Sequence, residues 1–167
     1  MKRFPFQSTC GVRGASGAAC ERAWESAMKD GLFQILLFED NTADVYLVRL
    51  ALEEARLPFQ LEVCADGEEA LRRLGRMEAG EVSRPDALLL DMNLPKYGGR
   101  EILVSMRQGV IGSSLLAIVL TSSDSPKDRE LAAAMGVEHY FQKPADLAEF
   151  MHLGELVRNV LMPTARV

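Results

Sequence analysis

Ala87-Leu88-Leu89-Leu90-Asp91 is an uninterrupted apolar run that ends in an aspartate. Short apolar runs of this kind are typical of strands that are buried on both faces, as in parallel sheets covered by helices. Functional groups in such sheets gather beyond the carboxyl ends of the strands. Asp91 stands at that end, which makes it the first candidate functional residue.

Similar apolar runs occur on both sides of this stretch. Strands are expected at Phe33–Phe38, Phe59–Cys64, Leu115–Leu120 and Val137–Phe141. Helices are expected from Asn41 or Thr42 through Leu52, from Asp66-Gly67 to about Gly80, over Glu101–Arg107, from Pro126 to about Met135 and over Ala145–Leu161. Five strands that alternate with five helices through short links predict an α/β fold, a doubly wound parallel sheet with helices on both faces.

Length and composition limit the remaining choices. The chain has 167 residues, 48% of them hydrophobic, with a net charge of -5. This suits one domain, and we expect a flexible leader over 1–31, the domain over 32–162, a short tail over 163–167 and no output domain. The acidic balance argues against a nucleic-acid partner, no apolar run is long enough for a membrane span, and three cysteines without metal-type spacing indicate free thiols in the cytoplasm.

Polar residues stand where four of the expected strands end. Glu39 and Asp40 follow the first strand, Asp91 the third, Thr121 the fourth and Lys143 the fifth. The carboxyl ends of parallel strands lie along one edge, so these residues are predicted to converge. Each has a simpler explanation alone, since a carboxylate after a strand often only caps the next helix. Their joint placement is what indicates a site.

The expected cluster suits phosphoryl chemistry. Crowded carboxylates repel one another, and Mg²⁺ prefers hard oxygen ligands of this kind. Lys143 adds a second positive charge that can pair with phosphate, and Thr121 adds a hydroxyl donor. Asp91 is then a carboxylate nucleophile able to form an acyl phosphate, because phosphoryl transfer needs mainly positioning and charge neutralisation.

The stretch from Phe33 to about Leu161 resembles a response-regulator receiver domain. The resemblance rests on Ile35–Asn41, Leu88–Pro95 with Gly98-Gly99, Leu120–Ser122 and Tyr140–Pro144. It implies a flavodoxin-like five-stranded sheet of order 2-1-3-4-5. The function implied is that of a single-domain response regulator rather than an enzyme, which accepts a phosphoryl group from a phosphohistidine kinase and changes conformation to bind a partner or pass the phosphate on.

The resemblance also assigns roles. Asp91 is implied as the phosphorylated residue, Asp40 and Asp91 as Mg²⁺ ligands, Glu39 as a direct or water-mediated ligand and the backbone carbonyl of Asn93 as the last protein ligand. Lys143 is implied to pair with Asp91 and then with the phosphoryl group.

Other residues are implied as switch or tuning positions. Thr121 is expected to move toward the phosphoryl group and Tyr140 to rotate into the space behind it. Ser123 and Asn93 occupy positions that tune the lifetime of the acyl phosphate in this family.

A narrower similarity points to partners. Asp40–Val45, Leu94–Arg100 and Lys143–Leu147 resemble the stand-alone regulators of phytochrome-type sensor kinases, which often dimerise through the last helix and strand. A sensor histidine kinase or a histidine phosphotransfer protein is the partner implied. Three alternatives are weighed. A haloacid-dehalogenase-like phosphatase requires an acid where Asn93 stands, and a flavin- or nucleotide-binding module requires a Gly-rich loop after the first strand. A degenerate receiver that no longer takes phosphate is disfavoured by the intact set of site residues.

Overall fold

The structure is a computed structural model that describes residues 31–122 and 125–163. Its strands are β1 (Phe33–Phe38), β2 (Phe59–Cys64), β3 (Ala87–Asp91), β4 (Ala117–Thr121) and β5 (His139–Gln142). Its helices are α2 (Thr42–Glu54), α3 (Gly67–Glu78), α4 (Gly99–Gln108), α5 (Pro126–Ala134), α6 (Leu147–Phe150), α7 (His152–Leu161) and the short 3-10 helix η1 (Gly112–Ser114). None of these helices is long and apolar enough to cross a membrane. The expected leader lies, apart from Gly31, outside the described residues.

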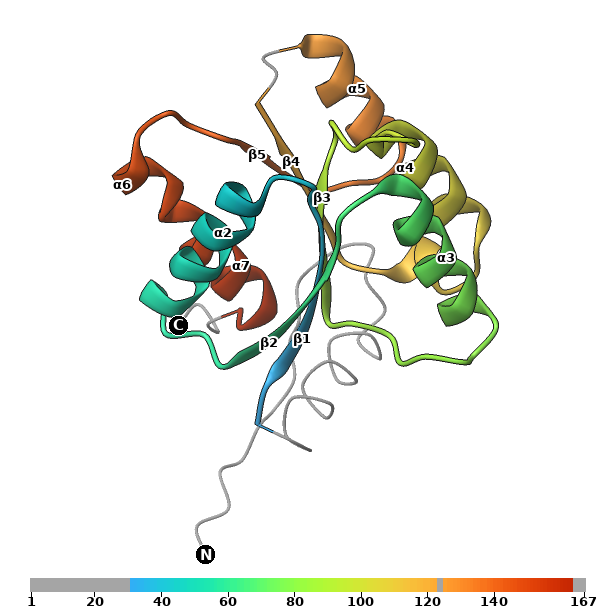
Figure 1. The fold of residues 1–167 in the computed structure, drawn as a ribbon, viewed down its shortest axis with the longest axis horizontal. Coiled ribbons are helices and arrows are strands. Elements are labelled where there is room, and N and C mark those ends of the chain that lie inside the picture. Colours follow the sequence, from blue (N-terminus) through green and yellow to red (C-terminus); the bar gives the residue numbers. More distant parts are fainter. Residues whose placement is uncertain (1–30, 123–124, 164–167) are drawn as a thin grey trace, which may run out of the picture.

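The five strands form one parallel sheet of order β2-β1-β3-β4-β5 (Figure 1). This confirms the predicted flavodoxin-like topology. In the central strands Phe38 pairs with Leu90, and Asp91 pairs with Leu120. The carboxyl ends of β1, β3 and β4 therefore lie at nearly the same level, which brings the residues that follow them to one edge.

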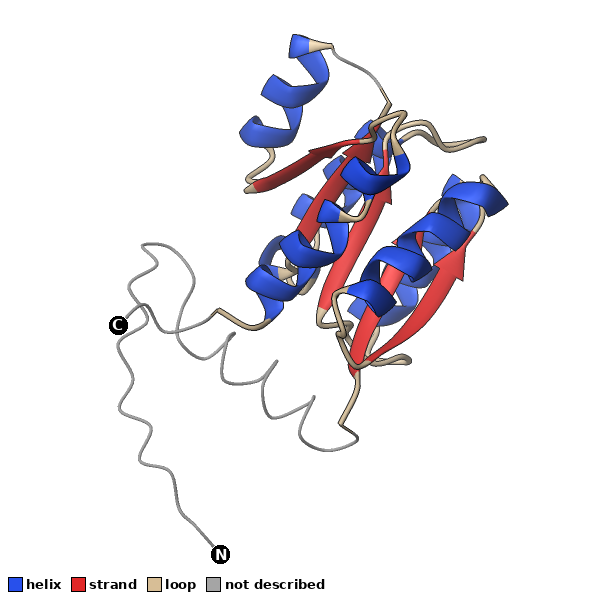
Figure 2. Ribbon diagram, turned by 90° about the vertical axis from the view of Figure 1, so that its left-hand side faces the viewer, coloured by secondary structure: helices blue, strands red, loops and turns tan. Residues whose placement is uncertain are grey.

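Helices cover both faces of the sheet (Figures 1 and 2). One face packs against α2, α6 and α7, and the other packs against α3, α4 and α5. In β3, Leu88 and Leu90 pack on the face covered by α3, α4 and α5, and Leu89 packs on the face covered by α2, α6 and α7. All three side chains are fully buried. Burial on both faces explains why the strand is apolar throughout instead of alternating.

The prediction of one continuous helix over Ala145–Leu161 is wrong. Helix α6 is a single turn whose cap, Asp146, accepts the backbone N–H of Glu149 at 3.1 Å, and α7 starts afresh at His152. Met151 between them keeps helical dihedral angles, with φ -62° and ψ -22°. The apolar spacing therefore continues through the break, and the residue pattern does not reveal it.

Two strands begin two residues later than expected. Leu115 donates its N–H to the carbonyl of Gly112 at 3.2 Å, which closes the η1 turn and delays β4 until Ala117. Val137 donates to the carbonyl of Ala132 at 2.9 Å, which completes the end of α5 and delays β5 until His139. In both places a turn uses the backbone donor that the strand needs.

Helices α2 and α7 approach closely at Gly154. A Cβ at this position would overlap the carbonyl oxygen of Ala51 in α2. Gly75, inside α3, offers a matched control because a Cβ there meets nothing within 4 Å. We expect Gly154→Ala to lower the free energy of unfolding by about 1–3 kcal/mol through overpacking, although alanine favours helices.

The free energy of unfolding of the control variant should change in the opposite direction. Gly75→Ala is expected to raise the free energy of unfolding by roughly 0.5–1 kcal/mol, because alanine restricts the unfolded chain and suits an open helix position. Urea titration followed by circular dichroism measures both changes. Equal shifts for the two variants would contradict the close approach of α2 and α7.

Candidate phosphoacceptor and metal site

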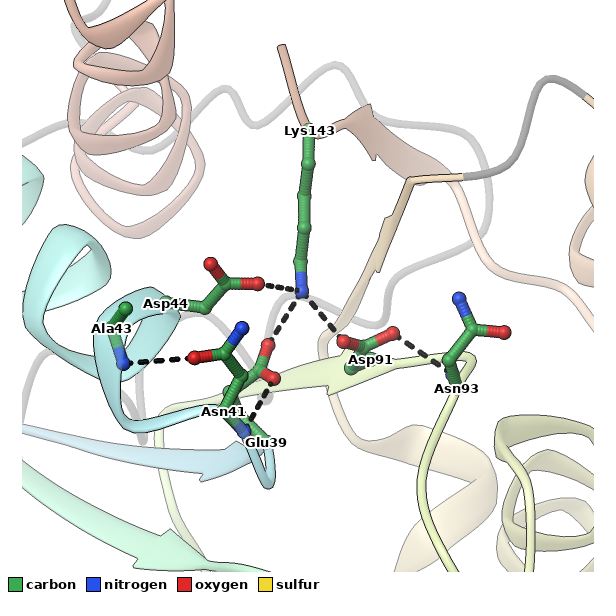
Figure 3. Close-up of polar contacts among 7 residues, drawn as sticks. All are labelled: Glu39, Asn41, Ala43, Asp44, Asp91, Asn93 and Lys143. Atoms are coloured by element: carbon green, nitrogen blue, oxygen red, sulfur yellow. Dashed lines mark hydrogen bonds and ion pairs between the residues drawn. The ribbon is translucent and has the colours of Figure 1, made fainter. Parts of the chain in front are cut away.

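Four strands bring polar side chains to the carboxyl edge of the sheet. Glu39 directly follows β1, Asp91 ends β3, Thr121 ends β4 and Lys143 directly follows β5. Figure 3 shows that the Lys143 side chain reaches across the edge and lies between Glu39 and Asp91. Residues from three separate strands thus make direct contact.

The ammonium group of Lys143 contacts three carboxylates. Its Nζ lies 2.6 Å from Glu39 Oε2, 2.6 Å from Asp91 Oδ2 and 2.7 Å from Asp44 Oδ2. The Lys143 side chain is only 6% exposed, and those of Glu39 and Asp91 are 0% and 6% exposed. A lysine ammonium has three N–H donors, so each donor has one carboxylate partner.

The charges of this cluster shift its pKa values. Burial disfavours the charged Lys143 side chain, but the hydrogen bonds that it donates to its carboxylate partners outweigh burial, so the pKa of Lys143 lies above its ordinary value. Burial raises the pKa of Glu39 to about 7, even though Lys143 opposes the shift. The single charge of the Lys143 ammonium faces three carboxylates, and a bound cation would offset the remaining negative charge when all three are ionised.

Three of the acidic residues are spaced as metal ligands. Glu39, Asp40 and Asp91 each offer one carboxylate oxygen, and these oxygens lie within 4.8 Å of one another. Asp40 is exposed while Glu39 and Asp91 are buried, so the group is open to solvent on one side only. Hard oxygen donors that carry several negative charges fit Mg²⁺, which commonly takes one or two carboxylates and keeps several waters.

Backbone donors orient the two buried carboxylates. Glu39 Oε1 accepts the N–H of Asn41 at 3.1 Å, and Asp91 Oδ1 accepts the N–H of Asn93 at 2.9 Å (Figure 3). The other oxygen of each carboxylate is bonded to Lys143. Both oxygens of both side chains therefore have a partner, which restricts their rotation and presents them in a defined geometry.

Asp44 is the site residue that the sequence alone did not identify. It lies in the first turn of α2, where a carboxylate is favoured by the helix dipole, and the sequence offers no other reason for it. Of the two residues at which this helix was expected to start, Asn41 is the cap, because its side chain accepts the N–H of Ala43 at 2.9 Å. Asp44 and Lys143 are 99 positions apart in the sequence, so a local sequence pattern cannot predict their contact.

Of the predicted switch residues, Thr121 contacts this cluster and Tyr140 lies in the neighbouring strand β5. Thr121 is fully buried, and its backbone carbonyl accepts the N–H of Lys143 at 2.7 Å. Tyr140 is half-buried in β5, and the guanidinium of Arg129 lies 5.0 Å from the centre of its ring. The Tyr140 hydroxyl is buried, with no hydrogen-bond partner among the described residues. Ser123 lies outside the described residues.

The loop after Asp91 is attached to the start of α3. The carbonyl of Pro95 accepts the N–H of Gly67 at 3.0 Å. Lys96, in a left-handed conformation with φ 68°, places its Nζ 2.8 Å from Asp66 and 2.9 Å from Glu68. These contacts hold the loop that also supplies the backbone donor to Asp91.

A doubly wound sheet of this order, with clustered carboxylates and a lysine at its carboxyl edge, defines a flavodoxin-like domain with an acidic, cation-attracting site. The sequence profile described as the response regulator receiver domain matches residues 35–154. The chain belongs to the response regulator receiver domain family, the signalling domains of two-component systems.

Individual relatives agree with this assignment. The probable methanogenesis regulatory protein FilR2 of Methanothrix harundinacea is 33% identical over 127 residues, which cover 76% of this chain and 82% of that protein. The response regulator Rcp1 of Synechocystis sp. is 31% identical over 131 residues, which cover 78% and 89%.

Solved structures show the same likeness. The phosphorylated cyanobacterial phytochrome response regulator RcpA matches with a TM-score of 0.72 and 32% identity, over 81% of this chain and 97% of that one. The Mn²⁺-bound form of Rcp1 matches with a TM-score of 0.71 and 29% identity, over 81% and 98%. The predicted similarity to regulators of phytochrome-type kinases is confirmed, and the acidic cluster, in a family whose members include a Mn²⁺-bound structure, supports Mg²⁺ as the cofactor.

Proposed function

We propose that Asp91 accepts the phosphoryl group that this response regulator receives from a histidine kinase. The observation that carries the proposal is the 2.6 Å contact between the buried Asp91 carboxylate and the Lys143 ammonium, beside the acidic cluster. A carboxylate held between two cationic positions is a nucleophile on which an incoming phosphoryl group meets compensating positive charge.

The proposed reaction is a direct transfer. An oxygen of Asp91 forms a bond to phosphorus, the phosphorus–nitrogen bond of the phosphohistidine breaks, and its electron pair stays on the imidazole nitrogen. Glu39, Asp40, Asp91 and the backbone carbonyl of Asn93 would hold Mg²⁺, which neutralises charge on the phosphoryl oxygens when bound. Lys143 keeps its position and donates to a phosphoryl oxygen in place of Asp91 Oδ2.

Thr121 and Tyr140 are proposed to transmit the effect of phosphorylation to the rest of the domain. The Thr121 hydroxyl is proposed to turn toward the phosphoryl group, which opens space behind it for Tyr140. The Tyr140 hydroxyl, buried with no partner in the described part of the chain, supports a second position for this ring, because a buried hydroxyl without a partner is costly. Phosphorylation then biases an equilibrium between two arrangements.

The phosphatase alternative loses its support. A haloacid-dehalogenase-like enzyme requires a second acidic residue two positions after the nucleophile, where this chain has Asn93. Here Asn93 contributes a backbone donor to Asp91 instead. The receiver-family match favours a phosphoacceptor that catalyses only its own phosphorylation and dephosphorylation over an enzyme with a separate substrate.

The proposed partner is a sensor histidine kinase of the phytochrome type, or a histidine phosphotransfer protein, in the cytoplasm. The likeness to Rcp1 and RcpA supports the kinase class. A homodimer through β5 and α7 is also proposed, since β5 is an edge strand of the described sheet. A nucleic-acid partner is not proposed for this acidic chain.

Chemical phosphorylation tests the proposal directly. The protein is incubated with acetyl phosphate in Mg²⁺ or in EDTA, the acyl phosphate is reduced with borohydride, and peptides are mapped by mass spectrometry. We expect one modified residue, Asp91, in the Mg²⁺ sample only. Label on Asp40 or Asp44, or equal label in EDTA, would contradict the assignment. A phosphotransfer profile against the histidine kinases of the source organism then identifies the partner.

A further inference from the structure

We infer that Asp44 is a positioning residue for Lys143. It holds the ammonium through a carboxylate of α2, so that Glu39 and Asp91 could weaken their bonds to the lysine on binding a metal ion without losing it from the site. The inference rests on the proposed function, because it concerns the same site at Asp91.

The three partners of Lys143 are not equivalent. Glu39 and Asp91 belong to the group of carboxylates spaced for a metal ion, whereas Asp44 does not. Two of the three lysine donors therefore bond to the same side chains that a divalent cation needs. The bond to Asp44, at 2.7 Å, is the one that metal binding leaves undisturbed.

Competition between the two cations gives Asp44 its effect. A lysine bonded only to Glu39 and Asp91 would occupy the carboxylates and would repel a second cation from them. Asp44 supplies the ammonium with a third anion, from helix α2, which lowers the cost of loosening either shared bond. It would also add negative charge to the site without belonging to the group of carboxylates spaced for a metal ion.

Asp44 is well placed for this role. Asn41 caps the helix through the N–H of Ala43, which fixes the first turn that carries Asp44. The rest of α2 packs against α7 in the core. The carboxylate is 23% exposed, less open than a free surface acid and more open than Glu39 or Asp91.

The first test is the affinity for Mg²⁺, measured by isothermal titration calorimetry on the full chain. Asp44→Asn keeps the side-chain shape and removes the charge, and we expect the Kd for Mg²⁺ to rise about three- to tenfold. The matched control is Asp128→Asn, which removes a carboxylate from the same helical position in the first turn of α5. It should change the Kd much less. An unchanged Kd for Asp44→Asn, or equal changes in both variants, would overturn the inference.

A double-mutant cycle separates positioning from the simple loss of a charge. Asp44→Asn is repeated in a Lys143→Met background, where there is no ammonium to hold. If Asp44 acts through Lys143, the factor by which Asp44→Asn raises the Kd shrinks in that background. The same factor in both backgrounds would mean that Asp44 acts only through its field, and the inference would be wrong.

Phosphorylation keeps this inference separable from the proposed function. Asp44→Asn should still be labelled at Asp91 by acetyl phosphate once Mg²⁺ is saturating, and Asp44→Glu should recover part of the lost affinity. No effect of Asp44→Asn while Asp91 is labelled would reject the positioning role and leave the phosphoacceptor intact. Label elsewhere than Asp91 would reject the proposed function, whatever the calorimetry shows.

Discussion

Asp91→Asn is expected to abolish phosphorylation by acetyl phosphate and by a cognate kinase. Asparagine has nearly the same shape, so the fold and the hydrogen bond from the Asn93 backbone should persist. The amide, however, is a far weaker nucleophile than a carboxylate and offers no charge to Mg²⁺ or Lys143. Intact-mass spectrometry after incubation in saturating Mg²⁺ should show wild-type protein carrying one phosphoryl group and the variant carrying none.

The matched control lies at the other end of the same strand. Asp86 directly precedes β3 and accepts the N–H of Gln34 at 2.7 Å, far from the carboxyl edge. Asp86→Asn removes one charge from the chain but leaves the site unchanged, so labelling should stay near the wild-type level. Labelling retained in Asp91→Asn would place the nucleophile on another residue.

Lys143→Met is expected to destabilise the metal-free protein strongly. Methionine fills a similar volume but leaves Glu39 and Asp91 buried without their ammonium partner. Breaking a buried ion pair by removing one member costs about 3–5 kcal/mol. Urea unfolding at neutral pH in EDTA measures this loss. Mg²⁺ should restore much of the stability and bind more tightly than in wild type, because its competitor for both carboxylates is gone.

Lys96→Met provides the comparison. Lys96 also bridges two carboxylates, but Lys96 and Glu68 are exposed and Asp66 is partly exposed, so its removal should change stability far less. We also expect Lys143→Met, but not Lys96→Met, to impair signalling. In Lys143→Met the phosphorylated Asp91 lacks the cation that couples it to β5. The change in hydrogen exchange that phosphorylation causes should therefore be lost in this variant. Similar destabilisation by the two replacements would contradict the buried triple contact of Lys143.

Local sequence patterns were sufficient for the strands and for most of the helices. Leu88–Leu90 is apolar at every position, which is typical of a strand covered on both faces, and the rule for parallel strands then places Asp91 at the functional edge. The break at Met151 was not predictable in the same way. Its backbone angles are helical and the apolar spacing continues past it, so the sequence pattern gives no sign of two helices.

The residues of the site likewise divide into those that the sequence predicts and those that it does not. Glu39, Asp91 and Lys143 could be grouped because each one stands where a strand ends, and that position is visible in the sequence. Asp44 stands inside a helix, where its charge is already explained by the helix dipole, so nothing marks it for a second role. The anchoring of Lys96 to Asp66 and Glu68 joins two loops and is equally invisible before folding.

The order of apolar runs and strand-end acids was enough to determine the class of fold, the edge that carries the chemistry and the need for a divalent cation there. The folded chain alone decided that one ammonium is shared among three carboxylates, one of them from a helix. The physical reason is range: periodicity and capping act over a few neighbouring residues, whereas an ion pair depends on the final distance between atoms that the chain brings together from far apart.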